Sequence, residues 1–326
     1  MAVLIPHHAR ANPILHVTNG DCAAERIARA DLGGEILPWR DVLHEGPVPA
    51  GLTDAELRDR RAEFLGGREP SVVGQVLRDL EWRDARLAVS PRDEIVLWFE
   101  PDLYDQLQIL QILERLSRED HAGTRITAVE SVERMGDLDP SDVRELYVAR
   151  SPLPAGALEL AALAWERFRD PDPTGLEDLA ARPTPELPHL RDAVHRYLEE
   201  LPATRDGLSR SERQLLEALA GGPLQAREAF VAAHHARERL VFLGDTVFFD
   251  YLERLAAGAR PLVSLSRRPA DAAMASLTED GRRVLDGKLD WIDLGGSDRW
   301  LGGVHLAGRD AAWRWDPDER RVRRGR

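Results

Sequence analysis

The sequence predicts a three-layer α/β domain with a mainly parallel sheet, followed by a helical, winged-helix-like C-terminal domain. Short apolar strands alternate with amphipathic helices across residues 14–150, which is the order that builds parallel sheets. Within this region the run Ile95–Phe99 is continuously apolar, as expected of a strand buried on both faces. After residue 206, predicted helices precede a glycine-rich, tryptophan-containing stretch that is typical of a β-hairpin.

The α/β domain is expected to span residues 13–150. Thr53 and Glu56 have the spacing of a capping box at the start of one helix. Asp102 is a suitable N-cap for another, whose leucines recur at spacings of three and four and so define a buried face. Strands are predicted at residues 14–18, 35–37, 94–99, 125–129 and 145–148, and helices at 22–30, 53–65, 71–83 and 102–116.

The rest of the chain is expected to form a proline-punctuated helical linker region at 151–206, a domain at 207–316 and a loose basic tail at 317–326. The segments 300–306 and 311–315 flank Gly308-Arg309-Asp310 and are predicted to pair as the hairpin. Helices are predicted near 155–168, 175–181, 187–200, 209–220, 224–240, 245–257 and 278–286, with a strand at 261–265.

Charge and cysteine content narrow the class of protein. The net charge is −13, but residues 208–326 hold 20 Lys and Arg against 18 Asp and Glu. Nucleic-acid binding is driven by neutralisation of phosphates, so we expect any such contact to come from the C-terminal part.

Cys22 is the single cysteine, which fits a reducing, cytoplasmic location. No segment approaches the ~18 apolar residues of a membrane span, so no membrane partner is expected.

Polar residues follow three of the predicted strands at the point where each strand ends. In open parallel sheets, ligands bind outside the carboxyl ends of the strands. If the three strands are neighbours, their polar residues share one rim, where we expect a small-molecule ligand. These residues are Asn19, Gly20 and Asp21 after the first strand, Trp39, Asp41, His44 and Glu45 after the second, and Glu100, Asp102, Asp105 and Gln106 after the third.

This set of side chains suits acid–base chemistry. His44 and Glu45, with Asp41 nearby, are the candidates for proton transfer, because an imidazole and a carboxylate can divide the roles of acid and base. Glu100 and Asp102 are candidate carboxylate ligands, and a divalent cation is a possible cofactor. A structural interpretation stays open for each group, since such residues also form turns and cap helices. No phosphate-binding glycine loop, nucleophile elbow or HExxH motif is present.

The C-terminal hairpin has two interpretations. Its tryptophans, Trp300, Trp313 and Trp315, can pack it onto the helices. Alternatively, the hairpin is a wing that offers basic side chains to a nucleic-acid backbone. The basic residues in question are Arg299, Arg309 and Arg314.

Three N-terminal segments resemble a bacterial family filed as domain of unknown function 1835. They are LHVTNGDCAAE at 15–25, LPWRDVLHEGPVP at 37–49 and LWFEPDLYDQLQIL at 97–110. DGLSRSERQLLEAL at 206–219 and DRWLGGVHL at 298–306 are similar to the C-terminal region usually joined to that family. The family often has His where this chain has Pro101. The resemblance implies no activity, but it adds weight to the polar residues inside the matching segments.

Three functions follow as hypotheses. The first is a protein that binds a nucleotide or another phosphoester at the rim, with hydrolase or transferase chemistry. The second is a regulator in which the α/β domain senses a ligand and the C-terminal domain contacts DNA or RNA polymerase. The third is a scaffold without chemistry. A hollow at the rim with converging carboxylates favours the first, an exposed basic wing the second, and a flat rim the third.

Overall fold

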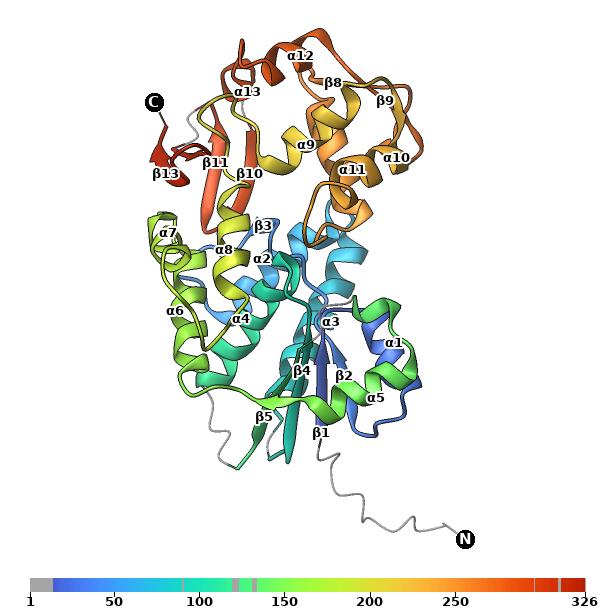
Figure 1. Cartoon of the computed structure of the whole chain (residues 1–326), viewed down its shortest axis with the longest axis vertical. Coiled ribbons are helices and arrows are strands. Elements are labelled where there is room, and N and C mark those ends of the chain that lie inside the picture. The colour runs from blue at the N-terminus through green and yellow to red at the C-terminus, as the bar shows by residue number, and fades with distance from the viewer. Residues whose placement is uncertain are drawn as a thin grey trace.

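A mainly parallel sheet lies at the centre of the N-terminal half, as predicted. The computed structural model describes residues 14–89, 91–118, 123–130, 134–295, 297–309 and 312–325. The strand order is β2-β1-β4-β5-β6, and only the edge strand β6 is antiparallel. Figure 1 shows this sheet in the lower half of the molecule, with helices on both sides. Its strands are β1 (Ile14–Thr18), β2 (Glu35–Pro38), β4 (Glu94–Phe99), β5 (Arg125–Glu130) and β6 (Ser151–Pro152).

Alternate residues of β4 belong to two different apolar clusters, which places helices on the two faces of the sheet. Val96 and Trp98 pack in a small cluster with α1 (Asp21–Arg29) and α5 (Pro140–Ala149). Ile95, Leu97 and Phe99 belong to the main cluster, which includes residues of three further helices. These are α2 (Asp54–Gly66), α3 (Pro70–Leu87) and α4 (Leu103–Arg118). The period of two along a strand explains this division of side chains.

One predicted strand of this domain is wrong. Residues 145–148 lie inside α5 rather than in a strand. Asp139 and Asp142 form a capping box and Pro140 occupies the first helical position, where its missing N–H costs nothing. Val143, Leu146 and Tyr147 then pack in the smaller cluster, at the helical spacings of three and four. The short apolar run by itself is typical of a strand, but the Asp139-Pro140 pair before it indicates a helix start.

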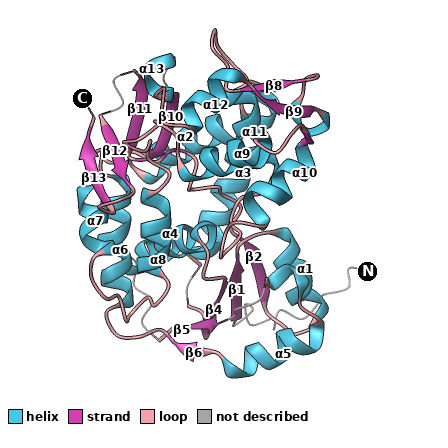
Figure 2. Ribbon diagram, turned by 45° about the horizontal axis from the view of Figure 1, so that its top comes forward, coloured by secondary structure: helices cyan, strands magenta, loops and turns pink. Residues whose placement is uncertain are grey.

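Helices predominate after residue 152. In Figure 2 the upper part of the molecule is mostly helical, with short strands at its margins. A three-stranded antiparallel sheet of order β7-β9-β8 lies beside α9, α10 and α11. The helices are α6 (Ala157–Arg169), α7 (Thr174–Ala180), α8 (Leu190–Leu198), α9 (Arg210–Leu219), α10 (Ala226–Phe230), α11 (Asp245–Leu255), α12 (Glu279–Leu285) and α13 (Trp291–Leu294), and the strands are β7 (Leu224–Gln225), β8 (Val263–Leu265) and β9 (Met274–Leu277).

The predicted C-terminal hairpin is wrong in its turn. β10 (Ser297–Gly302) pairs with β11 (Val304–Gly308), and the chain reverses at Gly303. Gly302 has a φ of +56° and a Cβ on Gly303 would lie 1.9 Å from the Arg169 carbonyl oxygen. Only glycine tolerates both conditions. Leu301 and Gly302 of β10 also pair in parallel with β3 (Gly46–Pro47), so this hairpin reaches back to the loop after β2.

The predicted loose tail is also wrong, because residues 321–324 of it form a strand. β13 (Arg321–Arg324) pairs antiparallel with β12 (Trp313–Asp316). Trp313, Trp315 and Val322 are buried in this pair, whereas the basic residues between them are partly or fully exposed. The alternation of apolar and basic residues is therefore that of a strand with one buried face. Residue 310 of the predicted turn at 308–310 lies outside the described residues, as does residue 311 at the start of the predicted segment 311–315.

A buried ion cluster joins the hairpin to the helices and to the α/β domain. We use this name for Arg196, Arg299, Glu45, Glu200, Glu238 and Tyr251. Arg299 Nη2 lies 2.5 Å from Glu45 Oε1 and 3.2 Å from Glu200 Oε2. Arg196 shares Glu200 at 2.7 Å and also contacts Glu238 at 2.9 Å. The Tyr251 hydroxyl donates to Glu45, and Arg299 donates to that hydroxyl at 2.6 Å.

The loop between β2 and β3 is held by a single arginine from α2. Arg61 donates to Asp41 Oδ1 at 2.6 Å, to the Glu45 carbonyl oxygen at 2.7 Å and to the Val42 carbonyl oxygen at 3.1 Å. The side chains of Arg61 and Asp41 are each 1% exposed. These bonds determine the path of the chain around His44.

No helix among the described residues is long and apolar enough to cross a membrane.

Two neighbouring residues, Asp41 and Arg40, provide a matched test of this anchor. Asp41→Ala leaves the Arg61 charge buried without its partner, which is expected to lower the free energy of unfolding by about 3–5 kcal/mol. Arg40→Ala breaks the exposed pair with Asp21, whose side chains are 52% and 70% exposed, and is expected to cost under ~1 kcal/mol. Urea unfolding monitored by circular dichroism measures both values. Equal losses in the two variants would contradict the role given to Asp41.

Candidate functional site

A cleft of about 380 Å³ opens at the carboxyl ends of β1 and β4, where the rim was predicted. We call it the rim cleft. The α/β domain forms one wall and the start of α11, with the loop before it, forms the other. Its lining residues are Asn19, Gly20, Asp21, Cys22, Val42, His44, Glu100, Asp102, Tyr104, Asp105, Arg134, Val241, Phe242, Leu243, Gly244, Thr246 and Val247.

Hydrogen bonds connect the polar residues that follow β1 to those that follow β4. The Asn19 amide donates to both carboxylate oxygens of Asp105, at 2.9 and 3.1 Å. Asp105 also accepts from the backbone N–H of Glu100 at 2.5 Å. The Tyr104 hydroxyl donates to the Asn19 carbonyl oxygen at 3.1 Å. Because β1 and β4 are adjacent and parallel, their ends meet at one edge and bring these side chains together.

Three carboxyl groups in the cleft have raised pKa values. Burial raises the pKa of Asp102 to about 7, helped by the charge of Glu100. Burial followed by the charge of Asp102 raises the pKa of Asp105 well above its ordinary value. Burial also raises the pKa of Glu100. Carboxyl groups whose charges repel one another share protons, so this cleft can present both hydrogen-bond donors and acceptors.

Asp102 is at once a helix cap and part of the cleft. Its Oδ1 accepts from the Asp105 backbone N–H at 3.1 Å, which confirms the predicted cap at the start of α4. The second carboxylate oxygen is not needed for this cap. The structural and the functional interpretation of Asp102 are therefore compatible.

His44 lies at the inner end of the cleft without a hydrogen-bond partner. Its side chain is 1% exposed, and neither ring nitrogen has a partner among the described residues. Tyr104 and Phe242 contact the ring edge-on, with centroids 5.8 and 5.3 Å away. Burial lowers the pKa of His44 to about 4. At neutral pH the ring is uncharged, and one nitrogen can donate while the other accepts.

The second wall of the cleft, Val241–Gly244, is held by a histidine that the sequence reasoning did not select. His234 Nε2 accepts from the backbone N–H groups of Phe242 and Leu243, at 3.2 and 3.0 Å. Burial lowers the pKa of His234 to about 3, which keeps this nitrogen free to accept. The residue belongs to a π-helical turn, Val231–His235, and such turns are frequent at functional sites. The sequence contains one signal for this wall: the apolar residues Val241, Phe242 and Leu243 lie between two predicted helices, where a loop is usually polar.

The N-terminus of α1 opens toward the cleft without a side-chain cap. Gly20 is the N-cap residue, and Asp21 is the first residue of the helix, so Asp21 does not cap it. The Asp21 carboxylate instead pairs with Arg40 at 2.6 Å. The first backbone N–H groups of the helix are therefore left for another acceptor, and Arg134 is a nearby cation in the lining.

Four of the predicted rim residues point elsewhere. Glu45 belongs to the buried ion cluster, so it does not form an acid–base pair with His44 in the cleft. Asp41 binds Arg61, as described above. Trp39 lies in the core, where its indole N–H donates to Gln111 at 2.9 Å. Gln106 donates to the Glu100 carbonyl oxygen at 2.9 Å and so supports the end of β4.

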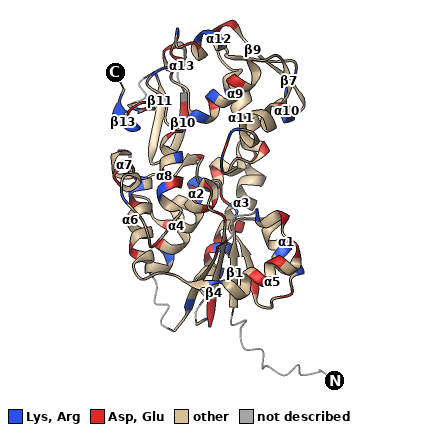
Figure 3. Cartoon of the chain, viewed as in Figure 1, with Lys and Arg blue, Asp and Glu red and all other residues tan. Residues whose placement is uncertain are grey.

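Two of the three predicted nucleic-acid-contacting arginines are engaged inside the protein. Arg299 is 5% exposed and is paired within the ion cluster. Arg314 contacts Asp290 at 3.1 Å with 14% of its side chain exposed. Arg309 is exposed. In Figure 3, β13 is coloured blue by its arginines, but Arg323 there pairs with Glu319 at 2.5 Å. Of the three arginines predicted for the wing, only Arg309 is thus exposed in the part of the chain that the structure describes.

Among the described residues, no group of three or more His, Cys, Asp or Glu side chains is arranged to hold a metal ion.

Comparison with known proteins does not identify the chain: no protein-family model matches it, and no curated protein is significantly similar to it in sequence. The function must therefore be argued from the cleft itself.

The raised pKa of Asp102 predicts a stability that depends on pH. The pKa of Asp102 in the folded protein lies above the unfolded value of 3.8. As the pH rises between these two values, the ionisation of Asp102 lowers the free energy of unfolding by up to about 1.4 kcal/mol per pH unit. Asp102→Asn removes the charge and keeps the cap. The free energy of unfolding of Asp102→Asn is therefore expected to exceed that of the wild type increasingly from pH 4 to pH 7.

Urea unfolding at pH 4.5, 5.5, 6.5 and 7.5 measures this gap. Asp59→Asn, at an exposed position on α2, serves as the control, and its gap from the wild type is expected to stay constant. A constant gap for Asp102→Asn as well would show that Asp102 ionises normally in the folded protein.

Proposed function

We propose that the chain binds a small polar ligand, a nucleotide or another phosphoester, in the rim cleft. The observation that carries this proposal is the convergence of Glu100, Asp102 and Asp105 with Asn19 around one hollow at the strand ends. Protonated and ionised carboxyl groups together suit the hydroxyl and amino groups of a sugar or a base. A ligand phosphate would find the uncapped N-terminus of α1 and the guanidinium of Arg134.

The same arrangement supports hydrolytic or transfer chemistry as part of this proposal. A group with a pKa of about 7 both gives and takes a proton near neutral pH, so Asp102 replaces Glu45 as the acid–base candidate. His44 is the second candidate, because its ring nitrogens have no partner in the described residues and it lines the cleft.

The resemblance to the family filed as domain of unknown function 1835 remains a proposal too. The segments that carry it supply Asn19, His44, Glu100, Asp102 and Asp105, which all line the cleft. If the family relation is real, this cleft is the feature that its members are expected to share.

A regulator is the second candidate, and the order of the C-terminal elements favours it. In this proposal the elements α9-β7-α10-α11-β8-β9, with the sheet order β7-β9-β8, would form a winged-helix module with the loop 266–273 as its wing. Arg267 and Arg268 lie on this loop. However, α11, the helix that would enter a DNA groove, contributes Tyr251 to the ion cluster and Val247 to the cleft. This packing favours the first function over DNA binding.

A ligand panel tests the first function. We expect at least one nucleotide or sugar phosphate to raise the melting temperature of the purified chain, because a ligand at 100 times its Kd stabilises by about 2.7 kcal/mol. Asp105→Asn and Glu100→Gln are expected to reduce this shift strongly, whereas Asp59→Asn leaves it unchanged. Duplex DNA belongs in the same panel at low salt.

Either of two results would contradict the proposal. One is a panel in which only duplex DNA raises the melting temperature, which would favour the regulator. The other is a nucleotide-induced shift of the same size in the wild type, Asp105→Asn and Glu100→Gln, which would place the ligand outside the rim cleft.

A further inference from the structure

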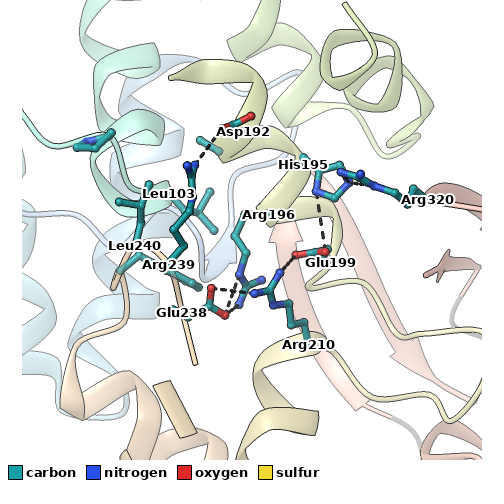
Figure 4. A pocket seen from close by; sticks show the side chains of 13 residues that line it. Leu103, Asp192, His195, Arg196, Glu199, Arg210, Glu238, Arg239, Leu240 and Arg320 are labelled. Carbon is teal, nitrogen blue, oxygen red and sulfur yellow. Dashed lines mark hydrogen bonds and ion pairs between the residues drawn. The ribbon is translucent and has the colours of Figure 1, made fainter. Parts of the chain in front are cut away.

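A second hollow lies on the other side of the segments that line the rim cleft. It has a volume of about 260 Å³ and is bordered by the start of α4, by α8, by the start of α9 and by the loop 238–242. Adjacent residues alternate between the two hollows: Leu103 and Leu240 line the second, whereas Asp102 and Val241 line the first. We call the second hollow the arginine pocket, after the four arginines shown around it in Figure 4.

The balance of charge in the arginine pocket is opposite to that of the whole chain. Its lining includes Arg196, Arg210, Arg239 and Arg320, against the carboxylates of Asp192, Glu199 and Glu238. The chain as a whole has a net charge of −13. A hollow with an excess of guanidinium groups in an acidic protein concentrates anions locally.

Arg320 is the cation without a carboxylate partner. Within the described residues it forms no ion pair, and its Nε and Nη2 atoms donate to His195 Nε2, at 3.0 and 2.8 Å. Because a guanidinium only donates, that nitrogen must accept, and the His195 ring is neutral with its proton on Nδ1. Nδ1 lies 3.9 Å from Glu199. The neutral ring thus orients Arg320 without neutralising its charge.

The backbone at Arg320 is also unusual. Its φ is +52°, a left-handed conformation that non-glycine residues rarely adopt and that tends to occur at functional positions. The turn between β12 and β13 therefore carries a charged side chain at a position that suits glycine better.

Two of the other arginines are accessible enough to join a ligand. The Arg239 side chain is 76% exposed and contacts Asp192 at 2.9 Å. The Arg210 side chain is 39% exposed and contacts Glu199 at 2.7 Å. Exposed pairs of this kind are weak, so a better acceptor can displace the carboxylate. Arg196 is buried and fixed by Glu200 and Glu238, and it forms the floor.

We propose that the arginine pocket binds a compact oxyanion, the phosphate or carboxylate group of a small molecule, with Arg320 as its principal contact. Guanidinium groups form paired, charge-assisted hydrogen bonds with both kinds of oxyanion. This site is separate from the rim cleft and does not depend on the function proposed for it, since the two sites share only Phe242 among the residues that line them.

The test uses inorganic phosphate and citrate as probes on the full chain, with sodium chloride at equal ionic strength as the reference. Phosphate, citrate or both are expected to raise the melting temperature above that in chloride, and the probe that does so identifies the oxyanion. Arg320→Gly suits the backbone conformation and removes the guanidinium, so it is expected to weaken binding roughly tenfold or more. Arg239→Gln is expected to weaken it less.

Arg29→Gln is the matched control, because Arg29 is an exposed arginine in an ion pair on α1. It is expected to bind the probe as the wild type does. The proposal is overturned if neither probe exceeds chloride in the wild type, or if Arg320→Gly binds the probe with unchanged affinity. Failure of nucleotides to bind the rim cleft would leave these outcomes unaffected, because no rim residue is altered.

Discussion

The pairing of Arg299 with Glu45 is the interaction on which the arrangement of the molecule depends. Burial alone would raise the pKa of Glu45 and of Glu200. The guanidinium of Arg299 lowers the pKa of Glu45, and those of Arg196 and Arg299 lower the pKa of Glu200. Two carboxylates therefore remain ionised inside the protein, which is tolerable only while both arginines stay in place. Since Glu45 comes from the loop after β2, Arg299 from the C-terminal hairpin and Tyr251 from α11, the ion cluster holds three distant segments in one position.

The rim cleft follows from this constraint. Tyr251 fixes α11, and the loop before α11 supplies Val241–Gly244, the wall that faces Asp102 and Asp105. Arg196 contributes as well, because its guanidinium lies 4.8 Å from the Phe242 ring centroid. Without this wall the carboxyl groups would be closer to water, and burial would raise their pKa values less. Their raised pKa values thus depend on the assembled chain as well as on the charges within the α/β domain.

The sequence predicted what local patterns determine. The apolar run of β4, the capping box at Thr53, the cap at Asp102 and the polar residues after each strand led to the sheet, to two helix starts and to much of the rim. It could not show that Glu45 and His44 would face opposite directions, because one residue along an irregular loop reverses a side chain. Nor could it locate the partner of Arg299, since that carboxylate is 254 residues away in the chain. The close approach of Gly303 to the backbone of α6 determines the true hairpin turn, whereas the local pattern Gly308-Arg309-Asp310 predicts a turn further along the chain.

Hydrogen exchange of the wild type and Arg299→Met tests most directly whether the ion cluster holds the wall of the cleft. Removing this guanidinium leaves Glu45 and Glu200 with fewer partners, and the account predicts faster exchange in residues 241–251 and 44–47. The amides of β1 and β4 should keep their protection, because the sheet has its own core. Unchanged exchange in residues 241–251, or an equal increase throughout the sheet, would contradict the account.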